Sequence, residues 1–180
     1  NITHTLGNQQ DKELKEVVLK NLEEASLIAS KYKQIIKNIK DKFRNRVVET
    51  LQENYSEYTI STQKEATKQY ASLWFNNVVS NTKEIWISAE SFSGLGNGDG
   101  ILFVGVFDKH KTLNLNEDYM PLTKQWVHHE VLMYQGVEIK MSDHAFLQKI
   151  SDDNVLETVV KTIVAQIIAF EKKYNYLTKA

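Results

Sequence analysis

The sequence predicts an α+β fold, in which N-terminal helices precede a small, mainly antiparallel sheet and a long C-terminal amphipathic helix packs on that sheet. Three observations predict this order. After Gly7 there is no glycine until Gly94, and the single proline is Pro121, so the first half lacks the residues that most often end a helix. Glycines then gather between short apolar segments that are typical of strands. A doubled apolar stripe near the C-terminus indicates the last helix.

The composition indicates one domain, residues 1–180, with a substantial core. Of the 180 residues, 42% are apolar and 10% are aromatic, as in ordinary globular domains. Charged residues make up 25% and the net charge is −1, so no overall field favours nucleic acid or an acidic membrane surface. The chain has no cysteine, which excludes a disulfide scaffold, a thiolate zinc site and a cysteine nucleophile.

The compartment is expected to be the cytoplasm. The absence of cysteine fits a reducing environment, and no apolar run approaches the roughly 20 residues that span a bilayer. The polar segment 1–11 lacks a signal-peptide pattern, so we expect no membrane partner. The sequence does not begin with methionine, and we interpret it as an excerpt of a longer protein.

The N-terminal part, residues 1–55, is expected to be helical. A single helix over Asp11–Glu53 would be about 60 Å long, whereas a domain of this size has a radius of gyration of about 16 Å. We therefore expect a break near Asn38–Asn45, which gives two helices. Apolar residues recur at three- and four-residue steps, namely Leu14, Val17, Val18, Leu22, Ala25, Ile28, Ala29, Tyr32, Ile35, Ile36, Ile39, Phe43, Val47 and Leu51.

The sheet is expected within residues 70–141. The segment Ser93–Gly100 holds four of the seven glycines and two good turn dipeptides, Asn-Gly and Asp-Gly, which favours a hairpin loop between two strands. The segment that follows is apolar on both faces, as in a buried central strand. The expected strands are Glu84–Glu90, Ile101–Phe107, Gln125–Tyr134 and Gly136–Met141.

The C-terminal helix is expected over residues 151–176. Ser151–Asn154 supplies capping side chains and acids that suit a helix N-terminus. The apolar residues that follow form a doubled stripe, so this helix must pack on the sheet or on the N-terminal helices. They are Val155, Leu156, Val159, Val160, Ile163, Val164, Ile167 and Ile168.

A basic stretch on the expected N-terminal helix is our candidate nucleic-acid contact. Lys31–Arg46 carries seven cationic side chains against one acid, Asp41. Four of the cations fall on one helical stripe turned away from the apolar residues, and such a stripe can follow a row of phosphates. The alternative is an ordinary solvated helix face. The four candidates are Lys33, Lys37, Lys40 and Arg44.

The glycines and the histidines predict no ligand site. The glycines of Ser93–Gly100 alternate, which matches neither the P-loop nor the dinucleotide-binding fingerprint. On a strand His128 and His129 face opposite sides, whereas His128 and Glu130 share a face. Without a third firm ligand we expect half-exposed strand residues and neither a metal site nor a cofactor.

An acid-x-lysine pair, Glu138 and Lys140, lies on an expected strand, and Asp99 stands at the start of the apolar strand Ile101–Phe107. One carboxylate from each of two neighbouring strands can hold Mg²⁺, and a lysine beside them can orient or activate water for phosphodiester hydrolysis. As a pair on a strand surface, Glu138 and Lys140 would equally need no catalytic role.

This layout resembles the core motif of the PD-(D/E)XK nuclease superfamily. The resemblance implies Asp99 and Glu138 as metal ligands, Lys140 as the catalytic lysine and Mg²⁺ as the cofactor. In that case the chain is a divergent metal-dependent nuclease.

A broader resemblance covers the chain from Leu14 to Tyr174. The stretch Ala25–Ile39 is similar to the helix that follows the nuclease core in a group of bacterial PD-(D/E)XK-like proteins, which look restriction-like and defence-related. This resemblance implies an accessory C-terminal region that is not catalytic alone, a core upstream in a longer protein, and DNA as a partner. The corresponding tryptophan-bearing strand, glycine-rich turn and final helix are Ile85–Ser88, Ser93–Gly100 and Phe146–Tyr174.

Three functions remain open from the sequence. The first is a non-catalytic accessory module that contacts DNA or an upstream nuclease core. The second is the divergent Mg²⁺-dependent nuclease that uses Asp99, Glu138 and Lys140. The third is a protein–protein interaction domain in which the N-terminal helices pair with another subunit.

Overall fold

A computed structural model describes residues 2–77 and 83–179, with the side chains of residues 7–76 and 83–179. The chain divides into two compact units, Asn1–Ile36 and Lys37–Ala180, whereas the sequence predicted one domain. The division falls inside a helix, and each unit is described by itself. Across the described ranges, every helix is too short or too polar to cross a membrane.

The first unit contains α1 (Ile2–Lys20) and the beginning of α2 (Leu22–Asn54). The chain turns at Asn21, whose side-chain amide donates a hydrogen bond of 2.9 Å to the Val17 carbonyl oxygen. Asparagine side chains compete in this way with the regular helix hydrogen bonds. The predicted break near Asn38–Asn45 was wrong, because α2 continues through these residues.

Burial explains why α2 is continuous. From Lys37 onward the helix belongs to the second unit, where Phe43, Val47 and Leu51 are completely buried. These residues follow one another at four-residue steps, so they form a single stripe against the core. Packing along the stripe stabilises the helix through the segment where we had expected it to break.

The second unit is built on a five-stranded sheet in which every neighbouring pair is antiparallel and the spatial order equals the chain order. This confirms the predicted α+β class. The first two strands were not among the expected ones. The first was missed because its sequence YTISTQ is polar at an edge of the sheet. The strands are β1 (Tyr58–Gln63), β2 (Ser72–Asn77), β3 (Ile85–Glu90), β4 (Phe103–Asp108) and β5 (Trp126–Val131).

The remaining elements follow the sheet, apart from η1 (Gly98–Gly100), a short 3-10 turn between β3 and β4. A separate hairpin comprises β6 (Met133–Tyr134) and β7 (Val137–Glu138). The predicted C-terminal helix is present as α4, and its N-cap Asp152 accepts hydrogen bonds from the backbone N–H groups of Asn154 and Val155. The helices are α3 (His144–Ile150), α4 (Asp153–Tyr174) and α5 (Tyr176–Lys179).

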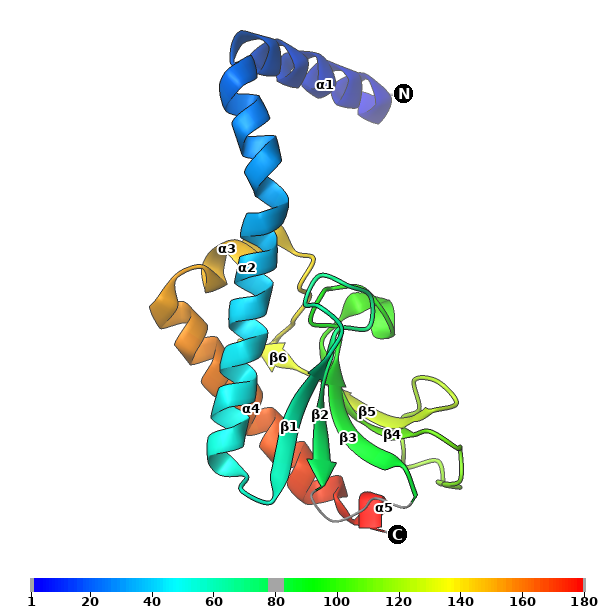
Figure 1. Cartoon of the computed structure of the whole chain (residues 1–180). Helices are drawn as coiled ribbons and strands as arrows, with labels where there is room; N and C mark the ends of the chain where they lie inside the picture. The colour runs from blue at the N-terminus through cyan, green and yellow to red at the C-terminus, as the bar shows by residue number, and fades with distance from the viewer. Residues whose placement is uncertain (1, 78–82, 180) are drawn as a thin grey trace. The chain divides into compact units, whose positions relative to one another are not determined.

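Within the second unit, α2 and α4 cover one face of the sheet (Figure 1). We call this the inner face, and it carries buried apolar residues such as Leu73, Ile87 and Val106. Because side chains alternate along a strand, the opposite or outer face carries Trp74 and Phe107. The two faces therefore differ: the inner one forms the core with the helices, and the outer one is rich in aromatic rings.

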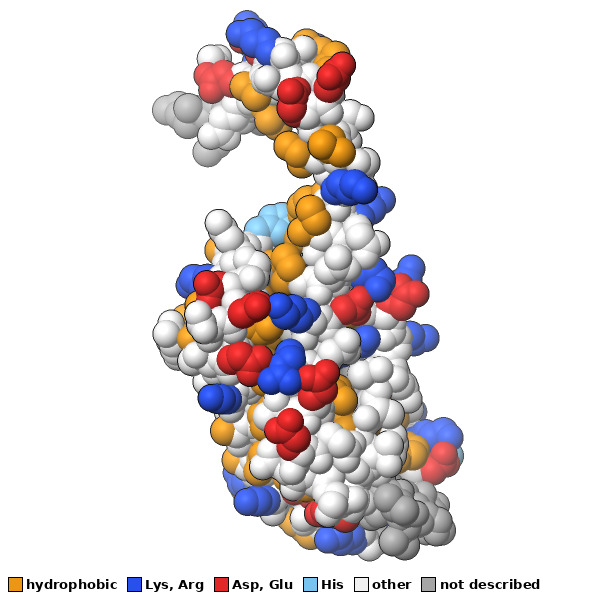
Figure 2. Space-filling view, turned by 60° about the vertical axis from the view of Figure 1, so that its left-hand side comes forward, with side chains coloured by type: hydrophobic (Ala, Val, Ile, Leu, Met, Phe, Trp, Pro, Cys, Tyr) orange, Lys and Arg blue, Asp and Glu red, His pale blue; other side chains and the backbone are white. Residues whose placement is uncertain are grey.

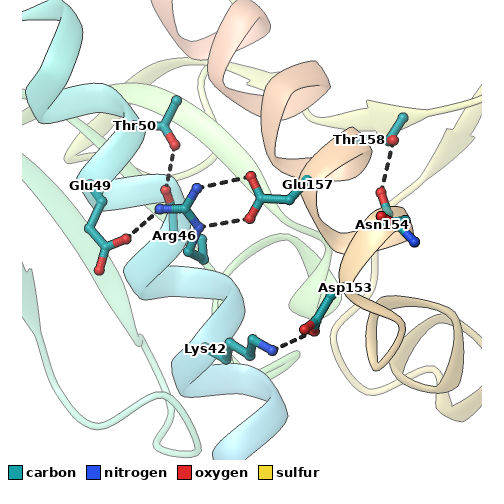
Figure 3. Close-up of polar contacts among 8 residues, drawn as sticks. All are labelled: Lys42, Arg46, Glu49, Thr50, Asp153, Asn154, Glu157 and Thr158. Atoms are coloured by element: carbon teal, nitrogen blue, oxygen red, sulfur yellow. Dashed lines mark hydrogen bonds and ion pairs between the residues drawn. The ribbon is translucent and has the colours of Figure 1, made fainter.

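Ion pairs join α2 to α4 at the surface, where cationic and acidic side chains are interleaved (Figure 2). Arg46 binds Glu157 through two parallel hydrogen bonds of 2.8 and 2.9 Å, and it also reaches Glu49 at 2.6 Å (Figure 3). Lys42 binds Asp153 at 2.5 Å. The hydrogen bonds from Arg46 lower the pKa of the Glu157 carboxyl. Four charges thus join the two helices: Lys42 and Arg46 of the basic stretch, and Asp153 and Glu157 of α4.

Candidate functional site

The three residues of the nuclease hypothesis lie on separate pieces of backbone. Asp99 occupies η1 with a left-handed φ of 55°, and its side chain is exposed. Glu138 lies on β7 and Lys140 just after it, and both are exposed. Lys140 forms an isolated antiparallel bridge with Ile101, so its backbone is close to the segment that carries Asp99.

The bridge does not bring Glu138 to Asp99. In an antiparallel pair, stepping from Lys140 back to Glu138 corresponds to stepping from Ile101 forward to Phe103. That direction leads away from Asp99. In the described residues, no group of three or more His, Asp or Glu side chains is placed to hold a metal ion. The nuclease assignment of Asp99, Glu138 and Lys140 stays a prediction.

Two of the four candidate phosphate-binding cations are buried. Lys40 is 8% exposed and its Nζ donates a 2.6 Å hydrogen bond to the Ser93 carbonyl oxygen, and burial lowers the pKa of Lys40. Arg44 is 6% exposed and its Nη1 donates to the Lys64 carbonyl oxygen at 2.8 Å. Both side chains therefore tie α2 to loops of the sheet.

The other two cations differ in setting. Lys37 forms an ion pair of 2.6 Å with Asp41 and is partly exposed. Lys33 is exposed and belongs to the first unit, whereas the other three belong to the second. The stripe is thus not one row of solvated charges, and phosphate binding by Lys33, Lys37, Lys40 and Arg44 stays a prediction.

His128 is a core residue and not the half-exposed side chain that we expected. It is 3% exposed, and its ring stacks on Phe170 of α4 with centroids 5.7 Å apart. Its Nδ1 accepts a hydrogen bond of 2.9 Å from the Met120 backbone N–H. Burial lowers the pKa of His128, so the ring is neutral at pH 7. Glu130 shares its face, as predicted, with 3.9 Å between Nε2 and the carboxylate.

The first unit exposes a large apolar surface, which we call the apolar helical surface (residues 14–35). Its residues include Ile28, which is 67% exposed, and a hollow of about 650 Å³ lies between the end of α1 and the start of α2. Exposed hydrophobic side chains on this unit are visible in Figure 2. The large exposed members are Leu14, Val17, Val18, Leu19, Leu22, Leu27, Ile28, Tyr32 and Ile35.

Charges flank this surface in a fixed order along α2. Glu23 and Glu24 occupy the first turn of the helix, where acids are favoured by the helix dipole. Lys31 and Lys33 follow beyond Ile28. Glu24 and Lys31 are two helical turns apart, so they lie on the same flank of the apolar stripe.

A second hollow, of about 400 Å³, opens on the outer face of the sheet. The sequence analysis missed it, because its walls come from strands that are distant in the chain. The sequence does contain a sign of this pocket: in β2 to β5, aromatic residues alternate with residues of the core. We call it the aromatic pocket, lined by Gln63, Lys64, Tyr70, Ser72, Trp74, Glu90, Asn97, Phe107, Thr123, Gln125 and Trp126.

Comparison with known proteins adds no family to these observations. No family model, no curated protein and no solved structure matches the chain. The resemblance to PD-(D/E)XK proteins therefore stays a prediction from the sequence. The function has to be argued from the geometry of the two units.

Proposed function

We propose that this chain is a protein-interaction module that pairs with a second copy of itself through the apolar helical surface. The observation that carries the proposal is the exposure of large apolar side chains from Leu14 to Ile35. Contiguous exposed apolar patches of this kind mark interaction sites. Full burial of one Leu, Ile or Val side chain contributes roughly 1.5–3 kcal/mol. A handful on each copy is therefore comparable with the association cost of about 4–15 kcal/mol.

The charges favour a second copy in an antiparallel orientation. When two α2 helices run antiparallel with their Ile28 residues at the centre, Glu24 of one copy faces Lys31 of the other. The two-fold axis makes the same contact twice. In a parallel pair the two-fold axis would put the charged flanks of the two copies on opposite sides of the interface, so Glu24 and Lys31 would not meet. The contact between Glu24 and Lys31 is thus formed in the antiparallel orientation.

This proposal keeps the accessory role that the sequence predicted and gives it a protein partner. The burial of Lys40 and Arg44 argues against DNA as the main contact, because both cations already bind backbone carbonyl oxygens. An upstream nuclease core is the competing occupant of the same apolar surface. Membership of a nuclease-like bacterial protein remains part of the proposal.

The test is the mass of the protein in solution, measured by sedimentation equilibrium over a concentration series. We expect a dimer at about 10 µM. Ile28→Glu should weaken association roughly a hundredfold or more, because it places a charge in the centre of the apolar surface. The matched control is Ser30→Glu, which adds the same charge on the side of α2 turned away from Ile28. It should weaken association less, because Leu22 and Leu27 lie beside Ser30, and the residues around Ile28 do not.

A wild-type protein that stays monomeric at about 100 µM would contradict self-pairing. So would a dimer that Ile28→Glu and Ser30→Glu weaken equally. In the first case the upstream nuclease core would be the expected partner of the apolar helical surface. In the second case the dimer would use some other surface.

A further inference from the structure

The aromatic pocket contains a buried carboxylate. Glu90 ends β3 on the outer face, opposite Ser72 of β2 and Phe103 of β4. Only 5% of Glu90 is exposed, and its Oε1 accepts a 2.9 Å hydrogen bond from the Asn97 side-chain amide. In the part of the chain that the structure describes, no cation forms an ion pair with Glu90.

Such a carboxylate is costly in the free protein. Withdrawal from water disfavours the charged form, and burial raises the pKa of Glu90 while the hydrogen bonds from Asn97 lower it only in part. A buried acid that lacks a cation and lines an open hollow can recover the lost solvation energy by binding a cation there.

Aromatic rings surround the same hollow. The rings of Trp74 and Phe107 are 5.1 Å apart at 84°, and those of Phe107 and Trp126 are 5.2 Å apart at 69°. The indole N–H of Trp74 donates to the Ser72 hydroxyl at 2.8 Å, which fixes the orientation of this ring. Faces of tryptophan, tyrosine and phenylalanine attract cations through the negative side of the ring.

Gly105 of β4 allows Trp126 of β5 to form one wall of the pocket. A Cβ atom at this position would lie 2.7 Å from the His128 carbonyl oxygen and 3.0 Å from a ring carbon of Trp126. Because glycine has no side chain, the Trp126 indole can pack directly on the backbone of β4 at this position. This arrangement is built into the backbone and does not depend on a mobile loop.

The geometry points to a binding site for an organic cation, an ammonium or guanidinium group that rests on the rings of Trp74, Phe107 and Trp126 and is neutralised by Glu90. The hollow of about 400 Å³ matches one small molecule or one long side chain. Two sources share this chemistry: a free amine, and a Lys or Arg side chain of a polypeptide.

Lys64 sits at the rim of the pocket and is exposed. Its ammonium group repels an entering cation through the solvent. The site therefore predicts that Lys64→Gln tightens the binding of a cation.

The experiment follows the indole N–H signals of the three tryptophans in the ¹⁵N-labelled 180-residue chain. The probe is N-acetylarginine methylamide, and its neutral isostere N-acetylcitrulline methylamide is the matched control ligand. We expect the Trp74 and Trp126 signals to shift saturably with the arginine probe and not with the citrulline one. Glu90→Gln should weaken binding roughly tenfold or more, and Lys64→Gln should strengthen it about twofold.

Glu84→Gln is the control variant, because Glu84 is a less buried acid before the same strand and already pairs with Lys109. It should leave the affinity unchanged. A short Arg-containing peptide that binds more tightly than the free probe identifies a polypeptide as the source, and equal affinity identifies a free amine. The proposal fails if the arginine probe gives no saturable shift, if citrulline binds equally, or if Glu90→Gln folds and binds as well as the wild type.

Discussion

Buried acids in this protein are satisfied by neutral donors. Asp108 is completely buried and accepts hydrogen bonds from the backbone N–H groups of His110 and Leu113, at 3.1 and 2.7 Å. Glu171 of α4 is 3% exposed and accepts from the hydroxyl of Tyr55 at 2.9 Å. Among the described residues, Glu90 accepts a side-chain hydrogen bond from Asn97 alone, and it faces a hollow. The first two acids therefore have structural roles, and the third is the one open to a ligand.

Removing the Asp108 carboxylate should destabilise the second unit. Asp108→Ala leaves the partly buried N–H of Leu113 without its acceptor, and hydrogen bonds to charged groups contribute about 1.5–3 kcal/mol each. We expect a loss of roughly 2–4 kcal/mol in the free energy of unfolding, measured by urea denaturation. Asp118→Ala, in the exposed neighbouring loop, is the control and should cost less than about 0.5 kcal/mol. Equal losses would contradict this role of Asp108.

The titration of Glu90 should make stability fall as the pH rises. Burial raises the pKa of Glu90 above its ordinary value of 4.5 in the folded protein, so the folded state keeps a proton that the unfolded state has already released. Stability is then greatest below the ordinary value and declines as pH rises through the raised one. The glutamine of the Glu90→Gln variant does not titrate. The free energy of unfolding of this variant, relative to that of the wild type, should therefore increase from about pH 4 to about pH 8. A stability difference independent of pH, in thermal unfolding without added amines, would contradict the argument.

Single residues show where sequence reasoning stops. The apolar stripe of α4 was predicted because it depends on spacing within one segment, and Leu156, Val160 and Ile163 are buried as expected. The role of Glu90 could not be predicted, because Trp74 and Trp126 come to it only through strand pairing. Lys40 and Arg44 looked like solvated cations for the same reason. Their partners are carbonyl oxygens of loops that follow much later in the chain.

At the scale of elements, α2 has two different environments. Its C-terminal part is buried against the sheet layer at Phe43, Val47 and Leu51. Its N-terminal part, with α1, exposes the apolar helical surface. Periodicity along the sequence treats both parts as one amphipathic helix, which is correct for secondary structure. It does not tell which part finds its partner inside the chain. The break near Asn38–Asn45 was expected from the length of a single helix, but α2 is continuous there and Phe43 is completely buried.

Charge exchange along α2 tests the antiparallel orientation of the proposed pair. Glu24→Lys should weaken dimerisation about threefold to tenfold, because it places lysines of the two copies opposite each other. Glu24→Lys combined with Lys31→Glu restores opposite charges across the two-fold axis, so the double variant should associate as the wild type does. Glu23→Lys makes the same change of net charge on the far side of the helix and should have little effect. Sedimentation at low salt gives the largest differences.

If the double variant is as weak as Glu24→Lys, the copies do not pair antiparallel. If Glu23→Lys is as harmful as Glu24→Lys, only the net charge matters. None of the three variants changes a large apolar side chain. Differences in affinity between them therefore report on the orientation of the two helices and not on apolar burial.

At the scale of the whole molecule, the two units divide the two proposed activities between them. The apolar helical surface lies within Asn1–Ile36, and the aromatic pocket lies within Lys37–Ala180. The second unit holds the sheet, α4 and the buried end of α2, so it contains a complete core. The fold class was predictable because helices, strands and the last helix follow one another as separate blocks along the sequence, whereas the division inside α2 depends on contacts between distant segments.

A protein that begins at Lys37 should therefore separate the two activities. Because the core residues of the second unit are retained, we expect cooperative thermal unfolding with a midpoint within about 3 °C of that of the monomeric Ile28→Glu variant of the 180-residue chain. Binding of the arginine probe should be unchanged, since every lining residue of the aromatic pocket is present. Self-association should be lost, because the apolar helical surface is gone. A truncated protein that still dimerises would place the interface on the second unit, and one that loses the probe while remaining folded would show that the pocket needs residues before Lys37.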